Sequence, residues 1–459
     1  MMNALRGMKL FMLIWFGQLV SQIGTAMTGF AVLIWAYEQT GEATTLALLG
    51  FFGFGTTVLV SPIAGVLVDR WDRRRVIILS DLASGLLSVL LLLLHTGGTL
   101  HIWHLYLVQA LLGALGAFWW PAYSASITLL VPKSQYSRAA GLRSVAGYAS
   151  NVLGPPLAGL VLAVAGLTGV LTIDVITFVF AVGMLLVVAI PNPPRDPAPA
   201  DQPVGLWRAV WGEFRGGVRV VVERRGLLWL LLLFALIHFV AALTYLSILS
   251  PMVLARSGGD ELALAGVQSA LGLGGVVGGL IMSAWGGPRR KIHLVLGGLA
   301  LSFLGGDLLF AIGQTPGVWA LGGFLAALFI PPITSGNAAI WQAKIAPAMQ
   351  GRVFSLQQAG NQGAQAIGYL LAGPLADRLF EPAMQPGGAL ANAFGGLVGT
   401  GPGAGMGLMF LCTCLLGLIV SLGGYAIPSL RRVESDLPDH EDVVEAIGSG
   451  LEAVEAAAR

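Results

Sequence analysis

The chain is short of charge. Only 10% of its 459 residues are Asp, Glu, Lys or Arg, whereas 56% are hydrophobic and the mean hydropathy is +0.80. Soluble domains carry about 25% charged residues, so this composition excludes a soluble globular protein. Cysteine is also scarce, since Cys412 and Cys414 are the only two. A C-x-C pair inside an apolar run is too small for a zinc site and indicates small residues for helix packing.

Signatures of ATP hydrolysis and of metal chemistry are missing as well. The chain has no G-x-x-x-x-G-K-[ST] phosphate-binding loop and no His/Cys cluster. A primary pump and a zinc enzyme are therefore disfavoured. We expect no enzymatic activity, no metal, no cofactor and no nucleic-acid partner.

Long apolar runs are what the sequence has in place of charge. A helix needs about twenty apolar residues to cross a bilayer. Twelve runs meet that length, with a very short connection at Gly166 between two of them. The first run is too long for the apolar part of a cleavable signal peptide, so we expect it to remain as a span. The predicted spans are 11–36, 43–68, 76–95, 101–131, 138–165, 167–190, 227–255, 262–285, 292–313, 316–345, 353–380 and 403–428.

Basic residues indicate the orientation of these spans. With a cytoplasmic amino terminus, all of the 25 Lys and Arg residues except Arg256 and Arg378 fall in cytoplasmic segments. Positive residues gather on the cytoplasmic loops of membrane proteins. We therefore expect a multi-pass protein of the cell membrane with both termini in the cytoplasm.

The segment 191–226 separates two groups of six spans. It begins with the proline-rich stretch 191–199, which cannot be helical. From Trp207 onward its apolar residues recur at helical spacing, which indicates an amphipathic helix in the inner interface. A solvated linker is the alternative.

The two groups of spans resemble each other at a constant offset of 214 residues. Arg75 matches Arg289, and Gly154 matches Gly368. A constant register across five spans indicates two parallel repeats. We expect an all-α membrane protein whose 12 transmembrane helices form two pseudo-symmetric six-helix bundles. The predicted units are a bundle at 1–190, a cytoplasmic linker at 191–226, a second bundle at 227–430 and an acidic, dispensable tail at 431–459.

The densest group of charges is the segment 65–75, which lies between two spans. Its four arginines would be costly at the bilayer centre and favourable among anionic headgroups, so it is predicted to be a cytoplasmic loop. The pattern Gly65-x-Leu-Val-Asp69-Arg70-x-x-Arg73-Arg74 resembles the loop signature of the major facilitator superfamily. Together with the Asp81 that follows, it is similar to the drug:proton antiporter-3 branch, which includes macrolide-efflux and enterobactin-exporter proteins.

The resemblance implies a gate on the cytoplasmic side. In the family the aspartate that matches Asp69 holds the end of a neighbouring helix and a basic residue, and a carboxylate beside Arg73 could link two helices in the same way. A plain positive anchor is the alternative. Ser150-x-x-x-Gly154-Pro155 is similar to the antiporter motif, with Ser150 in place of a glycine, although an ordinary kink would also explain it. The predicted gate residues are Gly65, Asp69, Arg70, Arg73, Asp81, Arg143, Gly154 and Pro155.

Ionisable residues inside spans are costly and therefore suggest function. Asp174, His238 and Asp307 are the candidates for proton coupling. The alternatives are a helix-end partner for Asp174, a neutral hydrogen-bonded side chain for His238, and packing for Asp307.

Polar and aromatic stripes on several spans predict a central cavity, because amides in a membrane must face protein or water. Interhelical hydrogen bonding is the alternative. A wall of amides and aromatics suits a bulky amphiphile of modest charge. We expect a monomeric, proton-driven exporter of lipophilic small molecules, with a siderophore exporter or a metabolite importer or facilitator as alternatives. The predicted cavity residues are Gln18, Gln22, Trp119, Tyr123, His238, Tyr245, Asn337, Trp341, Gln358, Asn361 and Gln362.

Overall fold

The computed structural model describes residues 2–130, 136–187, 215, 218–345 and 347–438, and all the regular structure in these ranges is helical. Ten stretches of the described chain are long and apolar enough to cross a membrane. One of them, Val145–Leu186, contains two spans, and a further span is too polar to be among the ten. These add up to twelve spans, as the sequence predicts.

The amino-terminal bundle contains six spans in five helices. Gly166 interrupts α5 with φ 61° and ψ −168°, a backbone conformation open to glycine and costly for other residues. The predicted short connection at this residue is therefore confirmed. The helices are α1 (Met2–Thr40), α2 (Ala43–Arg70), α3 (Arg73–Thr96), α4 (Ile102–Leu130) and α5 (Tyr136–Val187).

The carboxy-terminal bundle is built from shorter pieces. The seventh span consists of α7 (Arg225–Leu243) and α8 (Leu249–Ser257), and the eighth is α9 (Glu261–Trp285). A π-helical turn, η2 (Phe303–Asp307), joins α10 (Lys291–Ser302) to α11 (Leu308–Ile312) in the ninth. The remaining elements are α12 (Pro316–Leu328), α13 (Ile330–Lys344), α14 (Pro347–Leu375), η3 (Ala376–Phe380), α15 (Glu381–Met384), α16 (Ala391–Val398) and α17 (Ala404–Ala426).

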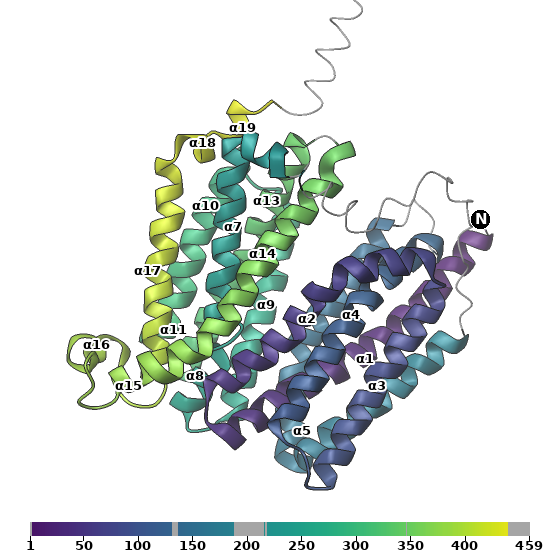
Figure 1. Ribbon diagram of the computed structural model, residues 1–459, viewed down its shortest axis with the longest axis horizontal. Coiled ribbons are helices and arrows are strands. Elements are labelled where there is room, and N and C mark those ends of the chain that lie inside the picture. The colour runs from purple at the N-terminus through teal and green to yellow at the C-terminus, as the bar shows by residue number, and fades with distance from the viewer. Residues whose placement is uncertain (1, 131–135, 188–214, 216–217, 346, 439–459) are drawn as a thin grey trace, which may run out of the picture.

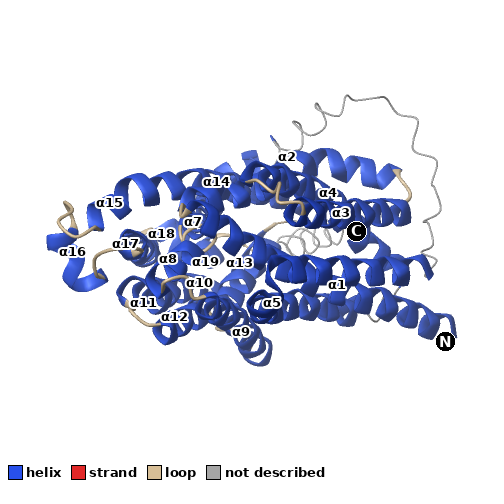
Figure 2. Ribbon diagram, turned by 90° about the horizontal axis from the view of Figure 1, so that it is seen from below, coloured by secondary structure: helices blue, strands red, loops and turns tan. Residues whose placement is uncertain are grey.

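The two bundles lean together at one end of the molecule and separate at the other (Figure 1). We call these the paired end, which carries the α1–α2 turn, and the separated end, which carries the α2–α3 turn. Seen from below the view of Figure 1, α14 lies beside α2 and α9 beside α5 (Figure 2). The close contacts between the described parts of the two bundles, such as that of Ser269 Oγ with the Val152 carbonyl at 3.2 Å, lie in the half of each helix nearer the paired end.

The buried apolar side chains follow this shape. One cluster joins both bundles at the paired end, where Ala43 and Leu46 of α2 share a core with Ala372 and Ala376. Toward the separated end each bundle has a core of its own, around Phe11 in one bundle and Trp341 in the other. Burial of apolar surface therefore holds the bundles together at one end only.

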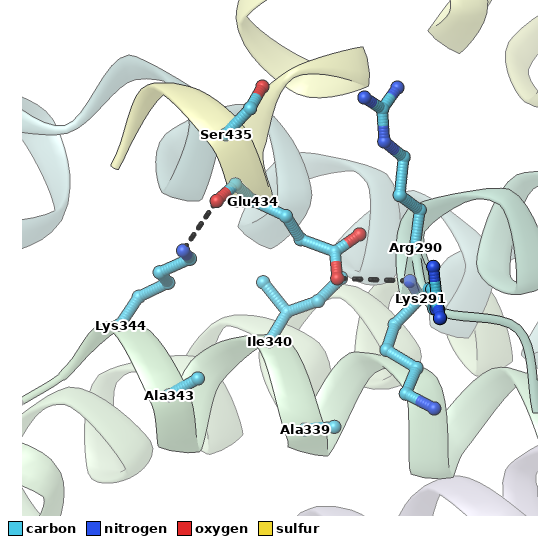
Figure 3. Close-up of a pocket in the computed structure, with 9 residues that line it drawn as sticks. Arg290, Lys291, Ala339, Ile340, Ala343, Lys344, Glu434 and Ser435 are labelled. Atoms are coloured by element: carbon cyan, nitrogen blue, oxygen red, sulfur yellow. Dashed lines mark hydrogen bonds between the residues drawn. The ribbon is translucent and has the colours of Figure 1, made fainter. Parts of the chain in front are cut away.

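The chain after the twelfth span folds back onto the carboxy-terminal bundle. The short helices α18 (Pro428–Arg431) and α19 (Val433–Asp436) cross its separated end. Val433 is 1% exposed. The Glu434 carboxylate accepts hydrogen bonds from two backbone N–H groups at the start of α10, that of Lys291 (Figure 3) and that of Ile292. Residues 431–437, which we predicted as part of an acidic cytoplasmic tail, thus pack on the bundle, whereas 439–459 lie outside the described residues.

The predicted amphipathic helix is described only near its carboxyl end. Residues 218–223 are helical, with Val221 buried and Arg219 exposed beside Glu223. Val221 belongs to the same core as Val433. The rest of the prediction, from Trp207 to Phe214, lies outside the described residues.

Candidate functional site

The amino-terminal bundle contains a cavity of about 580 Å³ at mid-height. Side chains from α1, α3, α4 and α5 form its wall, including the predicted Gln18, Gln22 and Trp119. Two carboxyl groups, those of Asp81 and Asp174, also line it, and no Lys or Arg is among its described lining residues. The two carboxyl groups can therefore bind a proton or a cationic group of a ligand in this cavity.

Asp81 lies opposite α1. Its Oδ2 accepts a hydrogen bond from Gln18 Nε2 at 3.0 Å. The buried indole N–H of Trp119 faces the same carboxyl group without reaching hydrogen-bonding geometry and donates to no described residue. We assigned Asp81 to the gate from its distance to the loop, and the structure places it in the wall of the cavity.

Asp174 joins three helices. Its carboxyl oxygens accept hydrogen bonds from Ser88 Oγ of α3 at 2.8 Å and from Thr25 Oγ1 of α1 at 3.3 Å. Asp174 is 3% exposed. An acid with only hydroxyl partners has no fixed cation to keep it ionised, so a proton or a cationic ligand can neutralise it.

A second cavity, of about 430 Å³, is lined by side chains of the carboxy-terminal bundle together with Phe54 of α2, in the amino-terminal bundle. One face of α14 supplies most of its polar groups, and no carboxylate is among the described lining residues. The Asn361 Oδ1 atom is buried without a hydrogen-bond donor among the described residues. The predicted His238, Asn337, Gln358, Asn361 and Gln362 line this cavity, as does Gln365 from the same polar stripe of the eleventh span, and Gln357, which we did not predict, lines it too.

His238 is oriented by its own helix. Its Nδ1 atom lies 2.8 Å from the Phe234 carbonyl, which requires Nδ1 to carry a proton and donate it. In the neutral ring Nε2 is then an acceptor. His238 and Phe234 both line the cavity, so the ring is held in place where a ligand can reach it.

Four predicted residues face the interior of a bundle instead of a described cavity. Tyr123 stacks on Trp119 and is 3% exposed. Trp341 is 1% exposed and donates its indole N–H to Asn337 Oδ1 at 3.0 Å. The hydroxyl groups of Tyr245 and Thr413 both donate to the fully buried carboxyl group of Asp307. Asp307 therefore links three spans of one bundle, and its part in proton coupling remains a prediction.

The predicted gate is described only in part. The side chains of Asp69, Arg70, Arg73 and Arg143, and Gly65, lie outside the described residues, although α2 itself ends at Arg70. Gly154 lies against Ala26 of α1, and a Cβ atom there would come within 2.6 Å of the alanine side chain. Gly154 and Pro155 therefore allow close packing of α5 on α1, and the gate itself stays a prediction.

Sequence reasoning missed a cluster at the paired end. The guanidinium group of Arg256 donates to the carbonyl groups of Phe310, Ala311, Gly313, Val398 and Gly403 at 2.9–3.3 Å. Arg256 is a half-buried cation whose donors are met by backbone carbonyl groups. Burial raises the pKa of Glu381, whose carboxylate accepts from the N–H groups of Gly403 and Met406 at the start of α17. The sequence did contain a sign of this cluster, since Arg256 is one of the two basic residues outside the predicted cytoplasmic segments.

Comparison with known families decides the identity of the fold. The Major Facilitator Superfamily model matches residues 14–369. The chain belongs to the major facilitator superfamily. It is accordingly a multi-pass membrane transporter of small molecules and not an enzyme, as the sequence predicts.

Relatives within the superfamily agree with the predicted branch. Macrolide efflux protein A of Streptococcus pyogenes is 29% identical over 376 residues, covering 80% of this chain and 90% of that protein. Macrolide efflux protein A of Enterococcus faecalis is 28% identical over 319 residues, covering 68% and 94%. These superfamily members are therefore consistent with a macrolide-efflux-like branch.

Among solved structures, a bacterial homologue of the human lysosomal transporter Spinster, in an inward-facing and unoccupied conformation, has a TM-score of 0.66. It is 13% identical, and the match covers 93% of this chain and 98% of the other. At this identity the likeness establishes the fold alone.

Proposed function

We propose that this superfamily member exports lipophilic, oxygen-rich amphiphiles such as macrolides, as a monomer, in exchange for protons and by alternating access. The observation that carries the proposal is the cavity of the amino-terminal bundle, where Asp81 and Asp174 are bonded only to neutral groups. The similarity to macrolide efflux proteins supports the substrate class.

The carboxyl groups support exchange because either a bound proton or a bound cationic group can neutralise their charge. A proton bound to Asp81 or Asp174 and a cationic group of a substrate would compete for the same site, so that binding one releases the other. One proton crossing a pH step of about one unit releases about 1.4 kcal/mol. A potential of about 100 mV adds about 2.3 kcal/mol per charge. For a neutral solute the two together would support roughly a several-hundredfold gradient. For a singly cationic solute exchanged one for one with a proton, no net charge moves, and the pH step alone would support roughly a tenfold gradient.

The second cavity supports an oxygen-rich substrate. Its amides both donate and accept, and Asn361 Oδ1 lacks a donor among the described residues. Hydroxyl and carbonyl groups of a large ligand would pair with such a wall, and the rings of Phe54, Phe234 and Phe354 would cover its apolar parts. Uptake of an organic anion is disfavoured, since neither cavity has a described Lys or Arg in its wall.

The proposed orientation is compatible with export. Five basic residues lie at the separated end, and the positive-inside rule supports a cytoplasmic location for that end; they are Arg74, Arg75, Arg289, Arg290 and Lys344. Both cavities would then be loaded from the cytoplasm and from the inner leaflet.

The test is accumulation of a labelled macrolide in cells that lack other pumps, with and without a protonophore. Asp81→Asn and Asp174→Asn should each lower efflux at least about tenfold and remove its dependence on the pH gradient. Asp436→Asn, at an exposed carboxylate on α19, is the control and should behave as the parent protein. Membrane content of each variant is measured alongside, since Asp174 also joins three helices. Efflux that persists with protonophore, or that both cavity variants retain, contradicts proton exchange.

A further inference from the structure

The paired end contains a hydrogen-bonded link between the two bundles. Asp377, in η3 of the carboxy-terminal bundle, accepts hydrogen bonds from the Ala43 N–H at 3.1 Å, the Thr44 N–H at 2.8 Å and the Thr44 hydroxyl at 2.6 Å. Ala43 and Thr44 are the first two residues of α2, in the other bundle. One carboxylate therefore holds the amino terminus of a helix across the interface.

The start of α2 depends on this carboxylate. The first N–H groups of a helix have no partner within the helix, and a side chain just before it usually accepts from them. Glu42 occupies that position and makes no such bond. A negative group at a helix amino terminus also interacts favourably with the helix dipole. The α2 helix thus receives its capping group from the opposite bundle.

The residues around Asp377 form one continuous face. Tyr369, Gly373 and Asp377 follow one another at four-residue spacing along the eleventh span, so they share a side of it. A Cβ atom at Gly373 would lie 2.2 Å from the Thr44 Cα, and one at Gly50 would lie 2.3 Å from the Tyr369 ring. The two backbones are therefore in close contact at Gly373, and the Tyr369 ring packs directly on Gly50.

We infer that Asp377 is a latch that stabilises the conformation in which the paired end is closed. Its three hydrogen bonds exist only while α2 and η3 touch, and separating them leaves both the α2 amino terminus and the carboxylate without their partners. A contact present in one of two conformations shifts the equilibrium toward that conformation by its differential free energy. The inference concerns the conformational equilibrium alone and holds whichever solute is carried.

The chain offers a matched control one helical turn away. Glu381 also holds a helix start, since it accepts from the Gly403 and Met406 N–H groups before and within α17, but both partners belong to its own bundle. Neutralising Glu381 alters a comparable cap whose hydrogen-bond partners all lie within one bundle. A shift caused by general loosening of the paired end would therefore appear in both variants, whereas a latch acts only through Asp377.

Distances between spin labels measure the equilibrium directly. The two native cysteines, Cys412 and Cys414, are replaced by alanine. Labels are then placed at exposed positions of the paired end with Glu42→Cys and Arg378→Cys, and of the separated end with Arg75→Cys and Arg289→Cys. Double electron–electron resonance is recorded on the full-length protein in lipid nanodiscs, without substrate.

The parent protein should give a short distance at the paired end and a long one at the separated end. Asp377→Ala should lower the ratio of closed to open paired ends by at least about tenfold, since several hydrogen bonds to a charged group are lost. Asp377→Asn, which keeps one acceptor oxygen, should give a smaller shift and serves if the alanine variant does not fold. Glu381→Gln should match the parent. Parent-like distances in both Asp377 variants, or an equal shift in Glu381→Gln, would overturn the inference. Because no transport is measured, the result stands apart from the test of proton-coupled export.

Discussion

Truncation of the carboxyl terminus should have opposite outcomes on the two sides of Pro438. Deleting 439–459 leaves Val433 and Glu434 and their contacts in place, and we expect no loss of stability. Deleting 433–459 also removes α19, with the buried Val433 and the Glu434 carboxylate that holds the start of α10. We expect this second deletion to destabilise the carboxy-terminal bundle.

The size of the effect can be worked out from three contacts. Burying a valine side chain contributes about 1.5–3 kcal/mol, and a capping side chain about 1 kcal/mol. The Lys344 ammonium group, 7% exposed, also donates to the Glu434 and Leu437 carbonyls, and hydrogen bonds of a charged group contribute about 1.5–3 kcal/mol. Water can enter the cavity of about 410 Å³ beside Lys344 and recover part of the last contribution. About 4 kcal/mol remains, or roughly 10 °C in Tm for a bundle of this size.

The assay is the thermal stability of the purified full chain and its variants in one detergent, followed by tryptophan fluorescence. Glu434→Ala alone should lower Tm by only a few degrees, since it removes the cap and leaves Val433 and both carbonyl groups in place. Equal Tm values for the deletions of 433–459 and 439–459 would refute the reasoning, because the contacts drawn in Figure 3 would then add nothing to stability.

Two further predictions concern backbone contacts. Gly278→Ala should lower the yield of folded protein and destabilise it by about 1–3 kcal/mol, because a Cβ atom there would lie 2.0 Å from the Leu328 carbonyl oxygen, whereas Gly279→Ala, with open space around it, should be nearly neutral in the same thermal assay. Arg256→Met should leave carbonyl groups at the paired end without their hydrogen-bond donor. Amide hydrogen exchange over 398–406 should become faster, with little change near the separated end. An equal change at both ends would contradict a local role for Arg256.

The sequence was informative about spans because the bilayer imposes a length and a polarity on them. Twelve apolar runs and the break at Gly166 follow from that constraint alone. The paired and separated ends were not predictable, since a repeat register says which helices correspond and not how far two bundles lean apart. The shared core around Ala43 and Ala372 is a property of one conformation.

The cavity residues were predictable where polarity is unusual and missed where it is not. Gln18 and Asn361 stand out in apolar runs, and both line cavities. Asp81 was assigned by its distance from the charged loop, but a side chain two turns into a helix is placed by the neighbour it meets, here Gln18 of α1. Asp377 follows a long apolar run in an ordinary helix end, so only the fold reveals that its partner is 333 residues away.

The acidic residues of the two bundles have different surroundings, although the two bundles are predicted to be repeats of each other. Asp81 and Asp174 line the cavity of the amino-terminal bundle, while Asp307 is enclosed by Tyr245 and Thr413 and lines neither cavity. The carboxy-terminal bundle presents amides to its cavity and reserves Asp377 for the interface. If charge is neutralised in one bundle and the latch is supplied by the other, coupling must pass through the contacts of α5 with α9 and of α2 with α14. Neutralising Asp81 or Asp174 should then change the fraction of molecules whose paired end is closed. This effect should disappear in variants whose α5–α9 or α2–α14 contacts are disrupted.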